Sequence, residues 1–122
     1  MLDGTNVLVI EEEFLIALDI QRMLEGLNSG QVLFARSAPE ASTMQDHWSA
    51  VGLAIVELGL KPTAALELVQ QLLEKRIPVV LCSADVAFST GAPQFPHLPL
   101  VTKPMAETDL VAAIGKVLAS KL

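Results

Sequence analysis

The chain has 122 residues, of which 52% are hydrophobic, and a formal net charge of −6 at pH 7. This length suits one domain with its own core, so we expect a single domain over residues 1–122. Only eight residues are Lys or Arg, which argues against direct binding to nucleic-acid phosphates, and neither a membrane helix nor a secretory signal is predicted. The single cysteine cannot form an internal disulfide, so we expect a reducing, cytoplasmic setting.

Short apolar runs recur along the chain at intervals that each leave room for one helix. Because polar residues do not alternate within them, the runs are typical of strands buried on both faces of a parallel sheet. The pattern predicts alternating strands and helices in an open α/β fold. The single cysteine, Cys82, lies in such a run, and we expect a small buried side chain rather than a reactive thiol. The five runs are Val7–Ile10, Val32–Ala35, Leu53–Val56, Val79–Cys82 and Leu100–Val101.

Most of the connecting segments have helical features. The first has an apolar stripe at helical spacing over residues 16–27. The second opens with Ser37 and Glu40 in the spacing of a capping box. The third has Pro62, which we place at the first helical position. The last has an apolar stripe over residues 110–118 and predicts the clearest helix.

The fourth connection differs from the others because it is rich in proline. Pro93, Pro96 and Pro99 follow Gly91 within a few residues, and proline both removes a backbone donor and clashes inside a helix. We expect at most a helical turn or two over residues 85–90. The fourth helix is therefore predicted to be short or irregular, and this segment to be mobile.

Polar side chains follow four of the predicted strands. The acidic residues 11–13 follow the first strand, Glu57 ends the third, Ser83 and Ala84 follow the fourth, and Lys103 follows the fifth. In an open parallel sheet, ligands bind beyond the carboxyl ends of the strands. We therefore expect these acids, the hydroxyl and the ammonium group to meet at one edge.

These stretches resemble the receiver domain of bacterial response regulators, in the family's order and close to its spacing. The resemblance rests on residues 7–13, 53–58, 77–84 and 101–104, which together reach from one end of the chain to the other. It implies a flavodoxin-like fold, with a five-stranded parallel sheet in the order 2-1-3-4-5 and helices on both faces. It also implies a signalling role in a two-component, phosphorelay system.

In that family, an aspartate at the end of the third strand accepts a phosphoryl group from a histidine kinase. Mg²⁺ is held by this aspartate and the acidic pair after the first strand, while a hydroxyl and a lysine contact the phosphoryl oxygens. By resemblance, Glu57 takes the phosphoacceptor position. The possible metal positions are Glu11, Glu12, Glu57 and the backbone carbonyl of Gly59, and the phosphoryl-contact positions are Ser83, Ala84 and Lys103.

The chain departs from the family at Glu57, where the longer side chain moves the carboxylate outward by about 1.5 Å. A misplacement of about 1 Å can already cost a hundredfold in rate, so we expect no phosphorylation. Two readings stay open. Glu57 either bonds Ser83 and Lys103 in partial imitation of a phosphoryl group, with less charge, or it fills a disused site through a salt bridge to Lys103.

Two further departures concern the switch and the metal. Leu100 stands at the switch position, three residues before Lys103, where the family usually has an aromatic residue. Glutamates hold both positions of the acidic pair, and Mg²⁺ demands a tight octahedral geometry. We therefore expect no cofactor, or Mg²⁺ bound only weakly. Glu13 is expected in the first turn of the following helix, where the helix dipole favours an acid.

The leading hypothesis is a non-enzymatic receiver-like module that acts through protein contact, with a histidine kinase or an output domain among the candidate partners. One alternative is a structural dimerisation module, in which the chain forms a homodimer. Another is a Mg²⁺-dependent receiver that is still phosphorylated. An enzyme acting on phosphate esters is disfavoured, because no Gly-rich loop follows the first strand.

Overall fold

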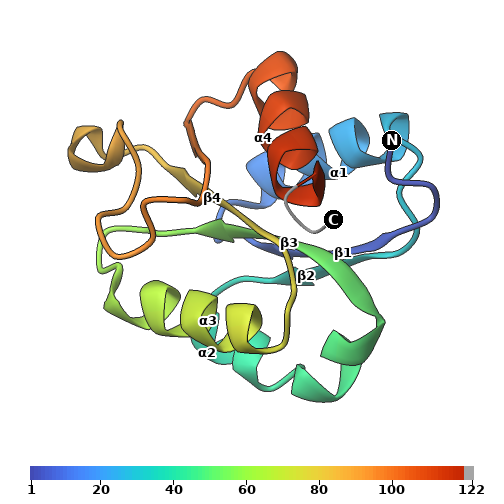
Figure 1. The fold of residues 1–122 in the computed structure, drawn as a ribbon, viewed down its shortest axis with the longest axis horizontal. Coiled ribbons are helices and arrows are strands. Elements are labelled where there is room, and N and C mark those ends of the chain that lie inside the picture. Colours follow the sequence, from blue (N-terminus) through green and yellow to red (C-terminus); the bar gives the residue numbers. More distant parts are fainter. Residues whose placement is uncertain (120–122) are drawn as a thin grey trace.

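The computed structural model describes residues 1–119, in which parallel strands form one sheet in the order β2-β1-β3-β4-β5 (Figure 1). Each predicted run falls within a strand. The predicted flavodoxin-like sheet order is confirmed. The strands are β1 (Asn6–Ile10), β2 (Val32–Ala35), β3 (Val51–Glu57), β4 (Val79–Ser83) and β5 (Leu100–Thr102).

Helices cover both faces of this sheet. In Figure 1, α1 and α4 lie on one face and α2 and α3 on the other, and the two buried clusters of side chains divide in the same way. None of the helices in residues 1–119 is long and apolar enough to cross a membrane. The α-helices are α1 (Phe14–Gly26), α2 (Ala38–Ser42), α3 (Thr63–Glu74) and α4 (Glu107–Ala119), and the 3-10 helices are η1 (Gln45–Ala50) and η2 (Val86–Phe88).

The core consists of two layers because successive strand residues point to opposite faces of the sheet. In β1, Val7 and Val9 join the cluster under α1 and α4, whereas Leu8 and Ile10 join the cluster under α2 and α3. All four side chains are at most 3% exposed. Burial on both faces explains why the strands appear in the sequence as continuous apolar runs.

The helix starts agree with the sequence pattern to within a residue or two. Ser37 caps α2, with its Oγ accepting a hydrogen bond from the Glu40 backbone N–H at 3.2 Å. Pro62 was predicted as the first residue of its helix, but α3 begins at Thr63. Glu13 was predicted in the first turn of α1 and instead lies just before it, with an extended backbone. Assignments of this kind depend on terminal backbone angles that apolar periodicity does not determine.

The fourth connection contains only the short helix η2, as predicted. Asp85 caps it by accepting a hydrogen bond from the Ala87 N–H at 2.9 Å. Beyond it, Phe95 and Leu98 bury their side chains against the cluster under α2 and α3. A loop therefore takes the place of a fourth full helix here. The mobility of this loop stays a prediction.

Candidate functional site

The carboxyl ends of the strands bring the predicted polar residues to one edge of the sheet. Glu11 directly follows β1, Glu57 ends β3, Ser83 ends β4 and Lys103 directly follows β5. Glu57, Ser83 and Lys103 line a cavity of about 310 Å³ at this edge. The cavity thus gathers side chains that are far apart in the sequence.

Lys103 lies at the centre of this group. Its side chain is 8% exposed, and its Nζ atom donates to both carboxylate oxygens of Glu11 at 3.2 Å. The same atom lies 3.2 Å from Oε2 of Glu57 and 3.8 Å from Oε1 of Glu13. One nearly buried ammonium group therefore faces three carboxylates.

Glu11 is the most deeply buried of these acids, with 3% of the residue exposed. Burial raises the pKa of Glu11, and this effect outweighs the hydrogen bond from the Glu13 N–H and the contact with Lys103, which both lower it. Burial lowers the pKa of Lys103, but its bonds to Glu11 and Glu57 outweigh burial, so that the pKa of Lys103 is raised overall. Lys103 is therefore a cation at neutral pH.

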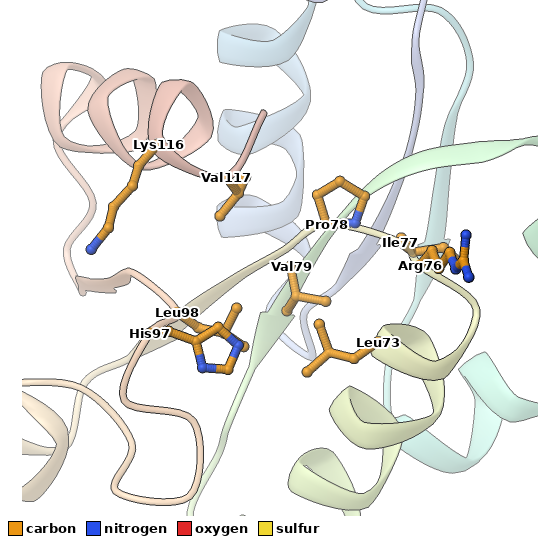
Figure 2. Close-up of a pocket in the computed structure, with 9 residues that line it drawn as sticks. All are labelled: Leu73, Arg76, Ile77, Pro78, Val79, His97, Leu98, Lys116 and Val117. Atoms are coloured by element: carbon orange, nitrogen blue, oxygen red, sulfur yellow. The ribbon is translucent and has the colours of Figure 1, made fainter. Parts of the chain in front are cut away.

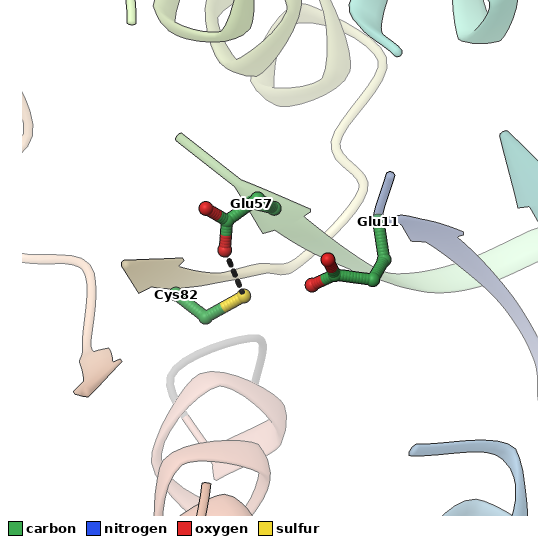
Figure 3. A group of neighbouring side chains, drawn as sticks. All are labelled: Glu11, Glu57 and Cys82. Atoms are coloured by element: carbon green, nitrogen blue, oxygen red, sulfur yellow. Dashed lines mark hydrogen bonds between the residues drawn. The ribbon is translucent and has the colours of Figure 1, made fainter. Parts of the chain in front are cut away.

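Both carboxylate oxygens of Glu57 are engaged. Oε1 accepts a hydrogen bond from the Gly59 N–H at 3.1 Å, and Oε2 contacts Lys103. Oε2 also accepts a hydrogen bond from the thiol of Cys82 at 3.4 Å (Figure 3). The side chain is therefore fixed by groups from three segments of the chain.

Cys82 is fully buried, as predicted for a residue in an apolar run. Burial raises the pKa of the Cys82 thiol well above its ordinary value, and the charges of Glu57 and Glu11 raise it further. The protonated thiol can therefore donate to Glu57. Sequence reasoning missed this contact, although Glu57 and Cys82 are register partners in the paired strands β3 and β4.

Ser83 does not form the hydrogen bond with Glu57 that one reading of the sequence predicted. Its side chain is buried, and its Oγ accepts a hydrogen bond from the Asp85 N–H at 3.0 Å. No hydrogen bond joins Ser83 to Glu57 within residues 1–119. The loop after β4 turns back on Ser83, and strand spacing alone does not predict that turn.

The remaining predicted site residues lie around this group. Glu12 and Ala84 are exposed and line the cavity, as does Gly59. Gly59 has a φ of +71°, a backbone conformation that glycine adopts readily. Leu100 is half-buried in β5 and packs against the cluster under α2 and α3. The roles assigned to these residues by resemblance stay predictions.

Three side chains near Lys103 form a potential cation-binding cluster. Ligand atoms of Glu11, Glu57 and Cys82 lie within 4.8 Å of one another, and Figure 3 shows the three side chains converging. Mg²⁺ prefers oxygen ligands in octahedral geometry, and a buried protonated thiol does not supply one. Because Lys103 lies 3.2 Å from both carboxylates, a metal ion would have to displace its ammonium group. The donor set therefore fits Mg²⁺ poorly.

Comparison with known proteins identifies several relatives, although no family model matches the chain. The phyllosphere-induced regulator PhyR of Methylorubrum extorquens is 31% identical over 118 residues, which is 94% of this chain and 44% of the relative. The chain thus spans about half the length of this curated relative.

Solved structures agree with this relationship. The receiver domain of the PhyR response regulator from Erythrobacter litoralis is 26% identical, with a TM-score of 0.79 over 95% of this chain and 91% of that one. The anti-anti-sigma factor PhyR from Bartonella quintana is 32% identical, with a TM-score of 0.72 over 97% of this chain and 49% of that one. With its five-stranded sheet and the polar residues at its carboxyl edge, this chain belongs to the response-regulator receiver family.

Proposed function

We propose that this chain is a phosphorylation-independent receiver module that regulates a protein partner by direct contact. The observation that carries the proposal is the contact of 3.2 Å between Nζ of Lys103 and Oε2 of Glu57. By resemblance, these residues stand where a receiver has its phosphoryl-contacting lysine and its phosphoacceptor. In this chain, the ammonium group of Lys103 and the carboxylate of Glu57 pair directly with each other.

The environment of Glu57 argues against its phosphorylation. An attacking carboxylate oxygen must reach the phosphorus atom in line with the leaving group, with cations placed to neutralise the spread charge. One oxygen of Glu57 accepts from Gly59, and the other is shared between Lys103 and Cys82. A phosphodonor would have to break one of these contacts and bring Mg²⁺ into a site that suits it poorly.

The same contacts bear on the state in which the module is held. Imitation of a phosphoryl group would engage both Ser83 and Lys103, but Ser83 is bonded to the backbone of Asp85 instead. Glu57 therefore reproduces the lysine contact alone. This favours the reading in which Glu57 fills a disused site and leaves the module in one fixed state.

Exposed apolar side chains around the same edge supply a surface for a partner. Leu15 is 78% exposed at the start of α1, Leu60 is 95% exposed after β3, and Val86 is 86% exposed after β4. Apolar side chains grouped on a surface mark contact sites for proteins. Because a relative is described as an anti-anti-sigma factor, we infer a protein partner in a signalling pathway of that kind.

The same exposed apolar residues could instead contact a second copy of this chain, as the dimerisation alternative requires. Light scattering over a dilution series separates the two functions. The regulatory module is expected to be monomeric at low concentration, whereas a dimerisation module keeps the mass of a dimer throughout.

Incubation with acetyl phosphate and Mg²⁺, followed by intact-mass analysis, tests phosphorylation independence directly. We expect the wild-type chain to gain no more phosphoryl mass than the Glu57→Gln variant, which lacks the acceptor carboxylate. A larger gain by the wild type would overturn the proposal and support the phosphorylatable alternative.

A further inference from the structure

A second cavity lies at the other end of the sheet from the acidic edge, with a volume of about 530 Å³. It opens between the end of α3, the start of β4, the loop before β5 and the end of α4 (Figure 2). Val79 at this cavity and Ser83 at the acidic edge are four residues apart on β4, or about 13 Å at the usual rise of about 3.3 Å per residue. The cavity is thus separate from the proposed regulatory site.

The base of this cavity is apolar. Val79 is fully buried, Ile77 is 4% exposed and Leu98 is 7% exposed, and the half-buried Leu73 completes one wall. Its volume lies in the range of about 300–1,000 Å³ that is usual for small-molecule sites. An apolar ligand group of moderate size could therefore be buried from water in this cavity.

Basic side chains surround the opening. Arg76, His97 and Lys116 all line the cavity and are exposed, and among residues 1–119 no acidic residue lines it. In the described part of the chain, none of the three has a carboxylate within 4.0 Å. Three basic side chains therefore gather at one opening of a chain whose net charge is −6.

The basic groups lie at the rim of the opening. In Figure 2, Lys116 and His97 lie on one side and Arg76 lies on the opposite side, and the ammonium group of Lys116 and the guanidinium group of Arg76 are both directed away from the apolar side chains at the centre. An anionic head group would therefore meet His97 and Lys116 at the outer rim of the cavity. Arg76 would add positive potential from the far rim.

The local backbone shows how the fold produces this site. The proline-rich loop replaces a fourth full helix and contributes His97 and Leu98. Arg76 ends the turn after α3 with a φ of +61°, where glycine or asparagine is the usual residue. A long basic side chain thus occupies a position that glycine or asparagine fills with less strain.

We propose that this cavity binds a small amphipathic anion, with an apolar body such as a medium-length acyl chain and a carboxylate head. The apolar body would pack on Ile77, Val79 and Leu98, and the head would pair with Lys116 and His97. Apolar burial would supply most of the affinity, and the basic rim would select the sign of the charge. This proposal does not depend on whether Glu57 is phosphorylated.

An NMR titration of the ¹⁵N-labelled chain with octanoate tests the site. We expect saturable shifts of the amides of Ile77, Val79 and Leu98. Three compounds serve as controls. Acetate has the carboxylate without the long alkyl chain, and 1-octanol has the alkyl chain without the charge. Octylammonium has the alkyl chain with a positive charge. Each should bind at least about fivefold more weakly than octanoate, which corresponds to about 1 kcal/mol. Equal binding of octanoate and octylammonium, or octanoate shifts centred elsewhere, would overturn the proposal.

Two charge reversals on exposed residues refine this test. Lys116→Glu is expected to weaken octanoate binding about tenfold and to strengthen octylammonium binding. Lys75→Glu makes the same change in net charge at a residue that does not line the cavity, and it should leave octanoate binding nearly unchanged. If both variants lose affinity equally, octanoate responds only to the overall charge of the chain and the specific site is refuted.

Discussion

Lys103 and Glu57 form a nearly buried ion pair, with Nζ and Oε2 separated by 3.2 Å and with 8% and 9% of their side chains exposed. The pair joins the carboxyl end of β3 to the residue that follows β5. Glu11, whose side chain is fully buried, contacts the same ammonium group. Because buried charges are costly unless they are paired, each member of this group depends on the others.

Removal of the ammonium group should destabilise the fold strongly. Lys103→Met keeps most of the apolar stem but leaves the carboxylates of Glu11 and Glu57 without their cation. Breaking a buried pair by removing one partner typically costs about 3–5 kcal/mol, and we expect a loss of about 3 kcal/mol in the free energy of unfolding at neutral pH. Urea unfolding followed by circular dichroism measures it.

The matched control for that variant is Arg22→Met on α1. Arg22 and Asp19 form an exposed pair at 3.9 Å, and pairs of this kind contribute about 0–1 kcal/mol. Equal stability losses in the two variants would show that the buried carboxylates do not depend on Lys103.

The raised pKa of Glu11 predicts a specific pH dependence. The folded chain holds the Glu11 proton more tightly than the unfolded chain, whose carboxyl has its ordinary pKa of 4.5. The resulting stabilisation is fully present below pH 4.5 and is lost as the pH rises through the folded pKa of Glu11. The unfolding free energy of the wild type should therefore fall relative to that of Glu11→Gln as the pH rises above about 4.5.

Urea unfolding of both chains at several pH values measures this difference. The opposite trend, with the wild type gaining on Glu11→Gln as the pH rises, would mean that the pair with Lys103 dominates over burial at Glu11. The stated direction of the pKa shift would then be wrong.

Cys82 should be protected from thiol reagents in the folded chain. The thiolate is the reactive form, and burial together with the nearby carboxylates raises the pKa of this thiol. We expect the reaction with Ellman's reagent at pH 8 to be at least about a hundredfold slower in buffer than in urea, because it requires opening of the fold. Comparable rates in the two solvents would show that Cys82 is accessible in the native state.

The fold was largely predictable because burial on both faces leaves a direct trace in the sequence. The apolar runs located all five strands, and Ser37 located the start of α2. The exact starts of α1 and α3 were less predictable. They depend on the backbone angles of Glu13 and Pro62, which apolar periodicity does not determine.

The sequence predicted which residues lie at the ends of the strands. It did not predict which of their atoms form contacts with one another. Lys103 was expected near Glu57 and lies there, whereas Ser83 turned to the backbone of Asp85. The contact of Cys82 with Glu57 could have been found by aligning β3 with β4, since the two residues are register partners. The basic cavity was not predictable, because α3, the proline-rich loop and α4 form it only after folding.

Shortening the side chain at position 57 should restore part of the receiver chemistry that resemblance implies. Glu57→Asp withdraws the carboxylate by about 1.5 Å, away from its contacts with Lys103 and Cys82. Mg²⁺ would then enter between residue 57 and Glu11 by displacing the ammonium group of Lys103 from Glu11. We expect this variant, treated with acetyl phosphate, to gain one phosphoryl mass in part of the molecules, and only when Mg²⁺ is present.

Intact-mass analysis with and without EDTA measures this gain, and Glu57→Gln gives the background. The physical reason for the expected rescue is alignment, because the remaining groups at this edge already surround the position that a shorter carboxylate would occupy. If Glu57→Asp stays at the background level although its circular dichroism matches that of the wild type, side-chain length is not what prevents phosphorylation. The cause would then lie in the poor fit of the glutamates and Cys82 to Mg²⁺.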